Sequence, residues 1–161
     1  MKQIICFHNP DEENGWLSNW YPSVFEYGGI RFSSMEQYMM YEKAAVFEDF
    51  ETAQKILAED DVAKIKKYGR QVANYEESVW NGIRQIVVYR GLIAKFTQNA
   101  DLAIKLQGTG MAILAECAVH DKIWGIGLSM YAPARFDMHK WKGQNLLGFA
   151  IMQVREERLN Q

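Results

Sequence analysis

One acidic and one basic side chain are spaced so that they can act together. Glu36 and Lys43 are seven residues apart in a segment that the sequence predicts to be helical. Seven residues make nearly two helical turns, so the two side chains share one face of the helix. A carboxyl and an amine that face one cavity can supply acid–base or covalent chemistry. The alternatives are that Glu36 caps the helix and that Lys43 is a solvated surface lysine.

Trp80 and Arg84 form a second pair, four residues apart on the longest predicted helix, so they also share a face. An indole can stack on a flat base, and a guanidinium can bind a phosphate. The alternative is a tryptophan in the core with an arginine at its rim.

Residues 118–142 form a long predicted loop that combines Asp121 with Trp124, Gly125 and Gly127. Loops of this length inside a compact domain are usually functional. Glycine allows the backbone to approach a ligand closely. The alternative is a tight turn, because the segment lacks the strand–GxGxxG–helix context of a dinucleotide fold.

The cysteines and histidines do not predict a metal centre. His8, His120 and His139 lack the spacing of metal ligands, so we expect no metal and no cofactor. Cys6 and Cys117 form no CxxC motif, and two reduced, buried thiols are favoured over a disulfide.

Helices must position most of these residues. The longest predicted helix covers residues 75–98, because its apolar side chains recur at three- and four-residue steps and form one stripe. Residues 33–47 form the helix of the acid–amine pair, and Ser33-x-x-Glu36 and Ser34-x-x-Gln37 both fit a capping box. The stripe of the longest helix consists of Val79, Ile83, Ile86, Val87, Tyr89, Arg90, Ile93 and Phe96.

The other predicted elements are short, so the expected fold is mainly α, an α+β arrangement with a few short strands. Further helices are expected at residues 50–58, 60–68, 101–105 and 143–158, the second of these stopped by Gly69. Strands are expected at residues 4–7 and 111–117, with a hairpin of residues 24–27 and 30–32 around Gly28-Gly29.

Length and charge restrict the class of protein. A chain of 161 residues suits one domain, residues 1–161. A net charge of −2 argues against general nucleic-acid binding, although a pocket for one nucleotide remains open. No apolar run approaches the roughly 18 residues of a membrane helix. Residues 1–7 are too short for a signal peptide, so we expect a cytoplasmic protein.

Seven segments, in order and at their spacing, resemble the NADAR family, also called the YbiA-like family. The resemblance covers nearly the whole chain. The segments are Leu17–Trp20, Phe32–Tyr38 with Lys43 after it, Gly69-Arg70, Trp80, Arg90–Phe96, Asp121–Gly125 and Gly143–Gly148.

The resemblance implies a compact, helical domain that hydrolyses N-glycosidic bonds. Two substrate classes follow from it: ribosylamino-pyrimidine phosphates early in riboflavin synthesis, and ADP-ribose attached to guanine. Met40 and Tyr41 stand where some members carry Gln and Ala, which leaves the substrate subgroup open. With the resemblance, the expected catalytic residues are Lys43, Glu36 and Asp121, and the expected substrate-binding residues are Asn19, Arg70, Trp80, Arg84, Trp124, Gly125 and Asn145.

N-glycoside cleavage builds positive charge at the ribose C1′. A lysine with a lowered pKa can trap the open-chain sugar as a Schiff base, and a nearby carboxyl can move the protons. A different alternative is a binding module for ADP-ribose or NAD-derived ligands. Such a module would keep the aromatic pocket but would not need the amine of Lys43.

Overall fold

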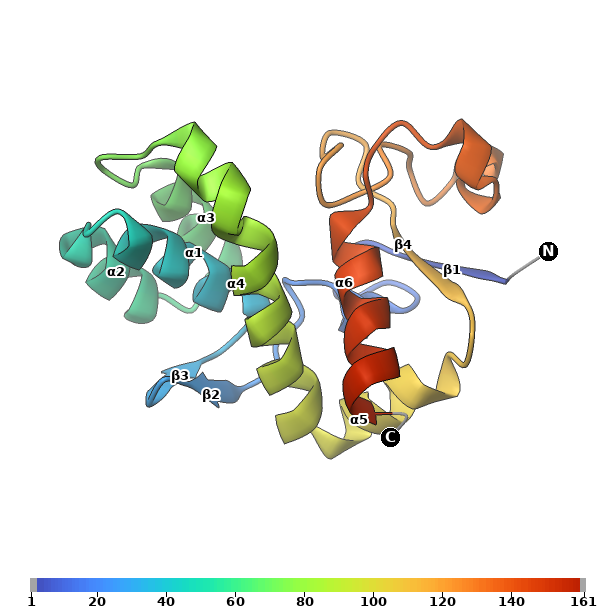
Figure 1. Cartoon of the computed structure of the whole chain (residues 1–161), viewed down its shortest axis with the longest axis horizontal. Coiled ribbons are helices and arrows are strands. Elements are labelled where there is room, and N and C mark those ends of the chain that lie inside the picture. The colour runs from blue at the N-terminus through green and yellow to red at the C-terminus, as the bar shows by residue number, and fades with distance from the viewer. Residues whose placement is uncertain (1–2, 160–161) are drawn as a thin grey trace.

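Helices make up most of the computed structural model, which describes residues 3–159, and two small pairs of strands lie at its edges (Figure 1). Helix α4 crosses the middle, with α1, α2 and α3 on one side and α6 with the β1–β4 pair on the other. The terminal residues 1, 2, 160 and 161 of the expected domain lie outside the described part. The fold is mainly α with a few short strands, as predicted. No helix in the described part combines the length and apolar character needed to cross a membrane.

The helices and strands occur in the predicted order. Strands β1 and β4 pair in parallel, and β2 and β3 form the predicted antiparallel hairpin. The helices are α1 Met35–Val46, α2 Phe50–Leu57, α3 Val62–Arg70, α4 Glu77–Gln98, α5 Ala100–Gly108 and α6 Leu146–Val154. The strands are β1 Ile4–Phe7, β2 Phe25–Tyr27, β3 Ile30–Phe32 and β4 Ile113–Glu116. Short 3₁₀ turns cover Gly15–Leu17, Pro133–Phe136 and Met138–Lys140, and a π turn covers Arg155–Leu159.

The start of α1 uses one of the two predicted capping boxes. The Gln37 backbone N–H donates to Ser34 Oγ over 3.1 Å, and the Ser33 backbone N–H donates to Gln37 Oε1 over 2.8 Å. Ser34 therefore satisfies one orphan donor of the first turn, and the Gln37 side chain fixes the residue before the cap. The carboxyl of Glu36 takes no part in this cap and is left for another role.

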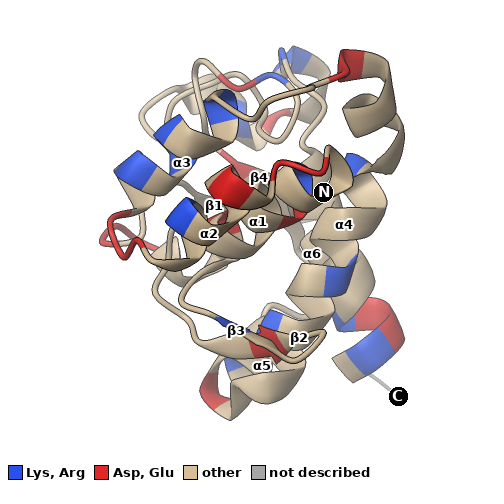
Figure 2. Cartoon of the chain, turned by 90° about the vertical axis from the view of Figure 1, so that its left-hand side faces the viewer, with Lys and Arg blue, Asp and Glu red and all other residues tan. Residues whose placement is uncertain are grey.

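Helix α3 carries Lys and Arg on successive turns (Figure 2) and does not stop where the sequence suggested. Gly69 lies inside the helix, which ends at Arg70, so the prediction of a glycine stop was wrong. A Cβ on Gly69 would lie 1.9 Å from Met40 Sδ. The glycine therefore serves the close packing of α3 against α1 rather than a helix end.

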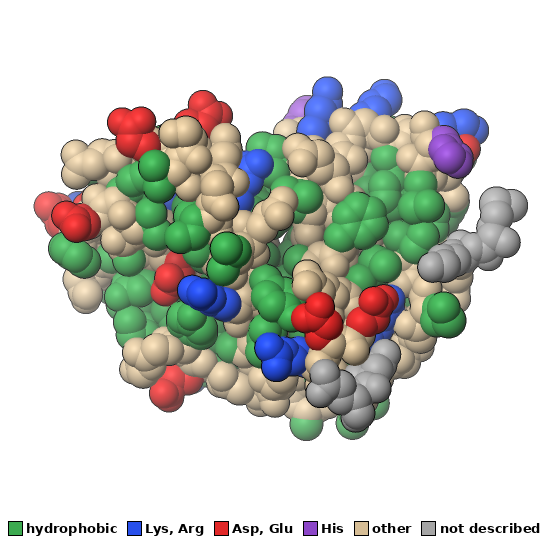
Figure 3. Space-filling model, in the orientation of Figure 1, with side chains coloured by type: hydrophobic (Ala, Val, Ile, Leu, Met, Phe, Trp, Pro, Cys, Tyr) green, Lys and Arg blue, Asp and Glu red, His purple; other side chains and the backbone are tan. Residues whose placement is uncertain are grey.

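The buried face of α4 is rotated from the predicted stripe. Val79 and Ile86 are 50% and 51% exposed, whereas Val88 and Leu92 are fully buried. Hydrophobic side chains accordingly remain on the molecular face that α4 and α6 form (Figure 3). The rotation has a physical reason, since α1 packs against the side of α4 that carries Gly91, where no side chain keeps the helices apart.

The last predicted helix begins later than expected. Residues 143–145 are extended or turned, and α6 starts at Leu146. Asn145 has a φ of 54°, a left-handed conformation that cannot continue a helix. This turn aims the start of α6 at β4, against which the helix packs.

We predict that Gly91→Ala destabilises the protein although alanine is the better helix former. A Cβ at Gly91 would lie 2.3 Å from Tyr38 Cε1, and the Tyr38 hydroxyl is fixed because it donates to the Val87 carbonyl over 2.8 Å. Overpacking of this kind costs about 1–3 kcal/mol. Urea unfolding measures the change.

The matched control is Gly82→Ala on the same helix, where a Cβ meets nothing within 4 Å. This change should raise the free energy of unfolding by about 0.5–1 kcal/mol. Equal stabilisation by both substitutions would contradict the close contact between α1 and α4.

Candidate active site

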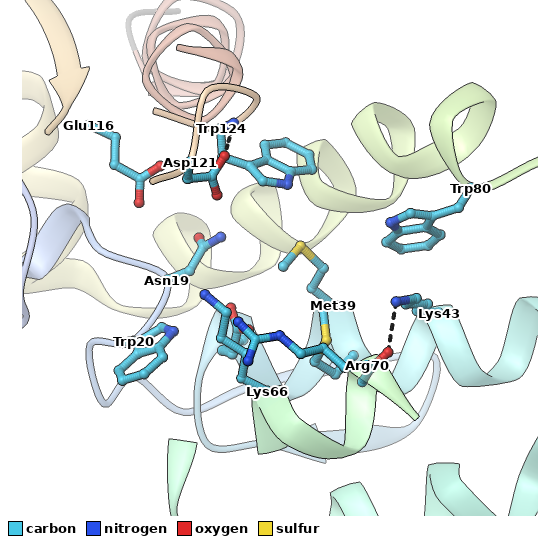
Figure 4. Close-up of a pocket in the computed structure, with 13 residues that line it drawn as sticks. Asn19, Trp20, Met39, Lys43, Lys66, Arg70, Trp80, Glu116, Asp121 and Trp124 are labelled. Carbon is cyan, nitrogen blue, oxygen red and sulfur yellow. Dashed lines mark hydrogen bonds between the residues drawn. The ribbon is translucent and has the colours of Figure 1, made fainter. Parts of the chain in front are cut away.

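Seven of the ten predicted site residues line one pocket of about 220 Å³ (Figure 4). The pocket lies among α1, α3, α4, the end of β4 and two loops. Predicted residues in its wall are Asn19, Glu36, Lys43, Arg70, Trp80, Asp121 and Trp124, and the other lining residues are Trp20, Met39, Met40, Lys66, Gly69 and Glu116.

Glu36 is 4% exposed and lies in the first turn of α1. Its backbone N–H donates to the Asn19 carbonyl over 2.9 Å, which ties the helix start to the loop before it. Burial raises the pKa of Glu36 to about 7, Lys66 opposes the shift, and Asp121 adds to it. The carboxyl is therefore partly protonated at neutral pH and can give or take a proton.

Lys43 lines the pocket from the last turn of α1 and is half-buried, so the surface-lysine alternative does not describe it. Its Nζ donates to the Gly69 carbonyl over 2.7 Å and lies 4.4 Å from the centre of the Tyr75 ring. Burial lowers the pKa of Lys43, Arg70 lowers it further, and Glu36 opposes the shift. A lowered pKa increases the fraction of free amine, the form that acts as a nucleophile.

The loop segment just before Asn19 is held by a buried lysine, Lys95, that the sequence did not single out. Lys95 Nζ donates to the carbonyls of Trp16 and Ser18 over 2.9 and 3.1 Å. Burial lowers the pKa of Lys95 to about 7. The amide oxygen Oδ1 of Asn19 is buried and has no hydrogen-bond partner among residues 3–159. That oxygen is available to a bound molecule.

The loop from Asp121 to Gly127 is fixed by its own hydrogen bonds. Asp121 Oδ1 accepts from the backbone N–H groups of Ile123 and Trp124 over 3.0 and 2.8 Å. A Cβ on Gly125 would lie 2.9 Å from the Asp121 carbonyl oxygen, and Gly127 has a φ of 69°. Both glycines therefore shape the turn that presents Asp121 and Trp124 to the pocket.

Three predicted site residues do not line the pocket. Gly125 lies behind it in the turn. The Arg84 guanidinium lies 5.9 Å from the centre of the Trp124 ring, and its Nε is buried without a partner among residues 3–159. Asn145 is fully buried: its Oδ1 accepts from the Glu116 N–H over 3.0 Å, and its Nδ2 donates to the Leu114 carbonyl over 2.8 Å. These contacts give Asn145 a structural position between β4 and α6.

Glu116 and Lys66 are pocket residues that the sequence reasoning missed. Burial raises the pKa of Glu116 to about 8, Asp121 and Glu36 raise it further, and Lys66 opposes them. Lys66 projects from α3 and lies 5.6 Å from the centre of the Trp20 ring. The sequence carries one signal for Glu116, which is the single acidic residue in the apolar segment 111–117. An acidic side chain is rarely buried in such a segment unless it has a function.

A wider groove of about 760 Å³ opens beside the pocket and shares part of its wall. We call it the outer groove. Its shared residues are Lys66, Arg70, Asp121 and Trp124, and its further residues include His8, His120 and Lys122. Basic side chains outnumber acidic ones in this lining, so an anionic group such as a phosphate is favoured there.

Comparison with known proteins agrees on one family over most of the chain. The model of the NADAR domain matches residues 6–159. N-glycosidase R617 of Acanthamoeba polyphaga mimivirus is 38% identical over 163 residues, which cover 96% of each chain. The riboflavin biosynthesis protein VVA0006 of Vibrio vulnificus is 34% identical over 98% of this chain, which covers 39% of that longer protein.

A solved structure has the same fold. The NMR structure of the Escherichia coli protein YbiA matches 98% of this chain and 85% of that chain, with a TM-score of 0.80 and 26% sequence identity. The N-glycosidase YbiA of Escherichia coli is 27% identical over 96% of this chain and 88% of its own.

We predict that ionisation of Glu36 makes folding pH-dependent. The folded pKa of about 7 lies above the unfolded value of 4.5, so this stability is present below pH 4.5 and is lost as pH rises to 7. The loss is at most about 3 kcal/mol, since one pKa unit is worth about 1.4 kcal/mol. Urea unfolding at pH 5 and pH 7 measures it.

Glu36→Gln should reduce this dependence between pH 5 and 7 and leave the part that Glu116 contributes through its own folded pKa of about 8. Glu26→Gln, on the exposed face of β2, should leave the dependence unchanged. Lys95, with a folded pKa of about 7, adds stability mainly above that pH and does not interfere in this range. The same pH slope in wild type and Glu36→Gln would show that Glu36 is not buried as a carboxyl.

Proposed function

The chain belongs to the NADAR family, and from that premise we propose that it is an N-glycosidase that hydrolyses the C–N bond at C1′ of a ribosyl group. The main support is the shared pocket of Glu36 and Lys43, where one carboxyl has a pKa near neutrality and one amine has a lowered pKa. Acid–base and covalent chemistry both need groups in these states. The names of the relatives as N-glycosidases support the same reaction class.

The proposed substrate is a nucleotide-like molecule of one of two classes: a ribosylamino-pyrimidine phosphate of riboflavin biosynthesis, or ADP-ribosylated guanine. The relative named as a riboflavin biosynthesis protein favours the first class. The large outer groove would accommodate the second. In both cases Arg70 and Lys66 are suited to a phosphate, and Trp80 or Trp124 to a base. Because such phosphates do not cross membranes unaided, we propose the cytoplasm as the compartment.

In the proposed mechanism Lys43 attacks C1′ as a free amine. The Nζ lone pair forms a bond to C1′ while the bond from C1′ to the base nitrogen breaks, and that nitrogen takes up a proton. Opening of the sugar ring gives a Schiff base, which water hydrolyses to free the sugar and the amine. Glu36 or Asp121 carries protons in these steps. In the alternative scheme water attacks directly, and Lys43 binds a phosphate or steadies Glu36.

We predict that the purified protein turns over at least one of the two substrate classes. Chromatography measures the reaction by detecting the free base or amine that is released. A binding module would instead hold ADP-ribose stoichiometrically and release nothing, which isothermal calorimetry beside the turnover assay would reveal. Binding without turnover of either class would refute the N-glycosidase proposal.

We predict that Lys43→Arg abolishes turnover, because arginine keeps the charge but not the nucleophilic amine. Lys105→Arg, on the exposed side of α5, is the matched control and should retain wild-type activity. Melting temperatures check that both variants fold.

Borohydride added during turnover provides a second measurement on the wild type. Reduction of the Schiff base should leave a stable ribosyl adduct on Lys43, visible by peptide mass spectrometry. Substantial activity of Lys43→Arg, together with no adduct, would favour water as the nucleophile.

A further inference from the structure

Glu116 is a buried carboxyl in the pocket that the mechanism above does not use. It ends β4 and lines the pocket beside Asp121. Its Oε2 atom is shielded from solvent and has no hydrogen-bond partner among residues 3–159. A buried carboxylate without a donor is costly, so the neutral acid is the favoured form.

The backbone of Glu116 is held on three sides, which fixes the point from which its side chain enters the pocket. Its N–H donates to Asn145 Oδ1, and its carbonyl accepts from the Ile126 N–H over 2.8 Å. Its Cα pairs with Phe7 in the parallel strand ladder. Loop, helix α6 and strand β1 therefore converge to fix this residue, an arrangement typical of a preorganised functional group.

The groups that face Glu116 come from four elements. Glu36 lies on α1, Lys66 on α3 and Asp121 on the loop after β4, and all three act on its pKa. His8, from the loop after β1, lines a smaller adjoining cavity with Glu116. Two acids against one lysine disfavour a further negative charge at Glu116.

The amine and this carboxyl lie on opposite sides of the pocket. Figure 4 shows Lys43 and Trp80 on one side, and Glu116 with Asp121 on the other, with Asn19 between them in the view. A substitution at C1′ places the attacking and leaving atoms on opposite faces of the sugar, and glycosidases put their proton donor on the leaving side. The geometry therefore separates nucleophile and proton donor as the reaction requires.

We propose that Glu116 is a further catalytic residue, the acid that protonates the nitrogen as it leaves C1′. This role rests on the proposed N-glycosidase function. The proton moves from the Glu116 carboxyl to the leaving nitrogen, which keeps the electron pair of the broken C–N bond. Glu116 is left as a carboxylate and regains its proton from the water that hydrolyses the sugar–enzyme bond. Glu36, on the same helix as Lys43, then serves the attacking side, and Asp121, beside Glu116, serves the hydrolytic water.

The test compares wild type with Glu116→Gln, which keeps the size of the side chain but cannot give up a proton. We expect kcat to fall about 10²- to 10⁴-fold, the usual contribution of a general acid, with KM changed less than about threefold. Wild-type kcat should decline above pH 8 as Glu116 loses its proton, and this alkaline decline should vanish in the variant. A kcat within tenfold of wild type, or an unchanged alkaline decline, would overturn the proposal.

Difference infrared spectroscopy gives a readout that does not depend on turnover. The carbonyl band of a protonated carboxyl should be present at pH 7 in wild type and in the control Glu26→Gln, and should lose intensity in Glu116→Gln. No loss of intensity would overturn the proposal even if the enzyme is active. A protein that shows the band but turns over neither substrate class would instead refute the N-glycosidase function, and the assigned role of Glu116 with it.

Discussion

The close approach of α1 to two other helices is the constraint on which the pocket depends. Gly69 lets α3 lie against Met40, and Gly91 lets α4 lie against Tyr38. A side chain at either position would displace Met40 or Tyr38 or push the helices apart, and would disturb the walls that carry Lys43, Arg70 and Trp80. Because protein interiors resist deformation, small packing residues of this kind fix the distances between catalytic groups on different helices.

Burial then decides the charge of the groups that this packing encloses. Glu36 and Glu116 have raised pKa values and Lys43 has a lowered one, so each shifts toward its neutral form. Desolvation is the first cause in all three. The pocket thus shifts its acids toward the protonated form and its amine toward the free base, the opposite of what water would do. A solvent-exposed cluster of the same residues would lack this property.

Periodicity and capping signals were sufficient for the order and type of most elements, because each depends on local sequence. The prediction that Glu36, Lys43 and Asp121 share a pocket required the family resemblance, because no local sequence signal reports proximity between residues about 80 positions apart. The rotation of α4 and the role of Gly69 were missed because both follow from packing partners elsewhere in the chain.

Asn145 was predicted to bind the substrate, but its side-chain amide forms hydrogen bonds with the backbone of β4. A buried polar side chain in a motif can serve either purpose.

The parallel pairing of β1 with β4 joins Ile4 to Ile113, residues 109 apart in the sequence. Closing so long a loop is entropically costly, so this pair is expected to form late in folding. Glu116 ends β4, and its amide is bound by Asn145, so this wall of the pocket cannot be complete until residue 145 has been synthesised. During translation helix α1, which carries Glu36 and Lys43, emerges before β4 and α6. A nascent chain therefore has no assembled site, and the domain acquires its chemistry only after residue 145 has left the ribosome.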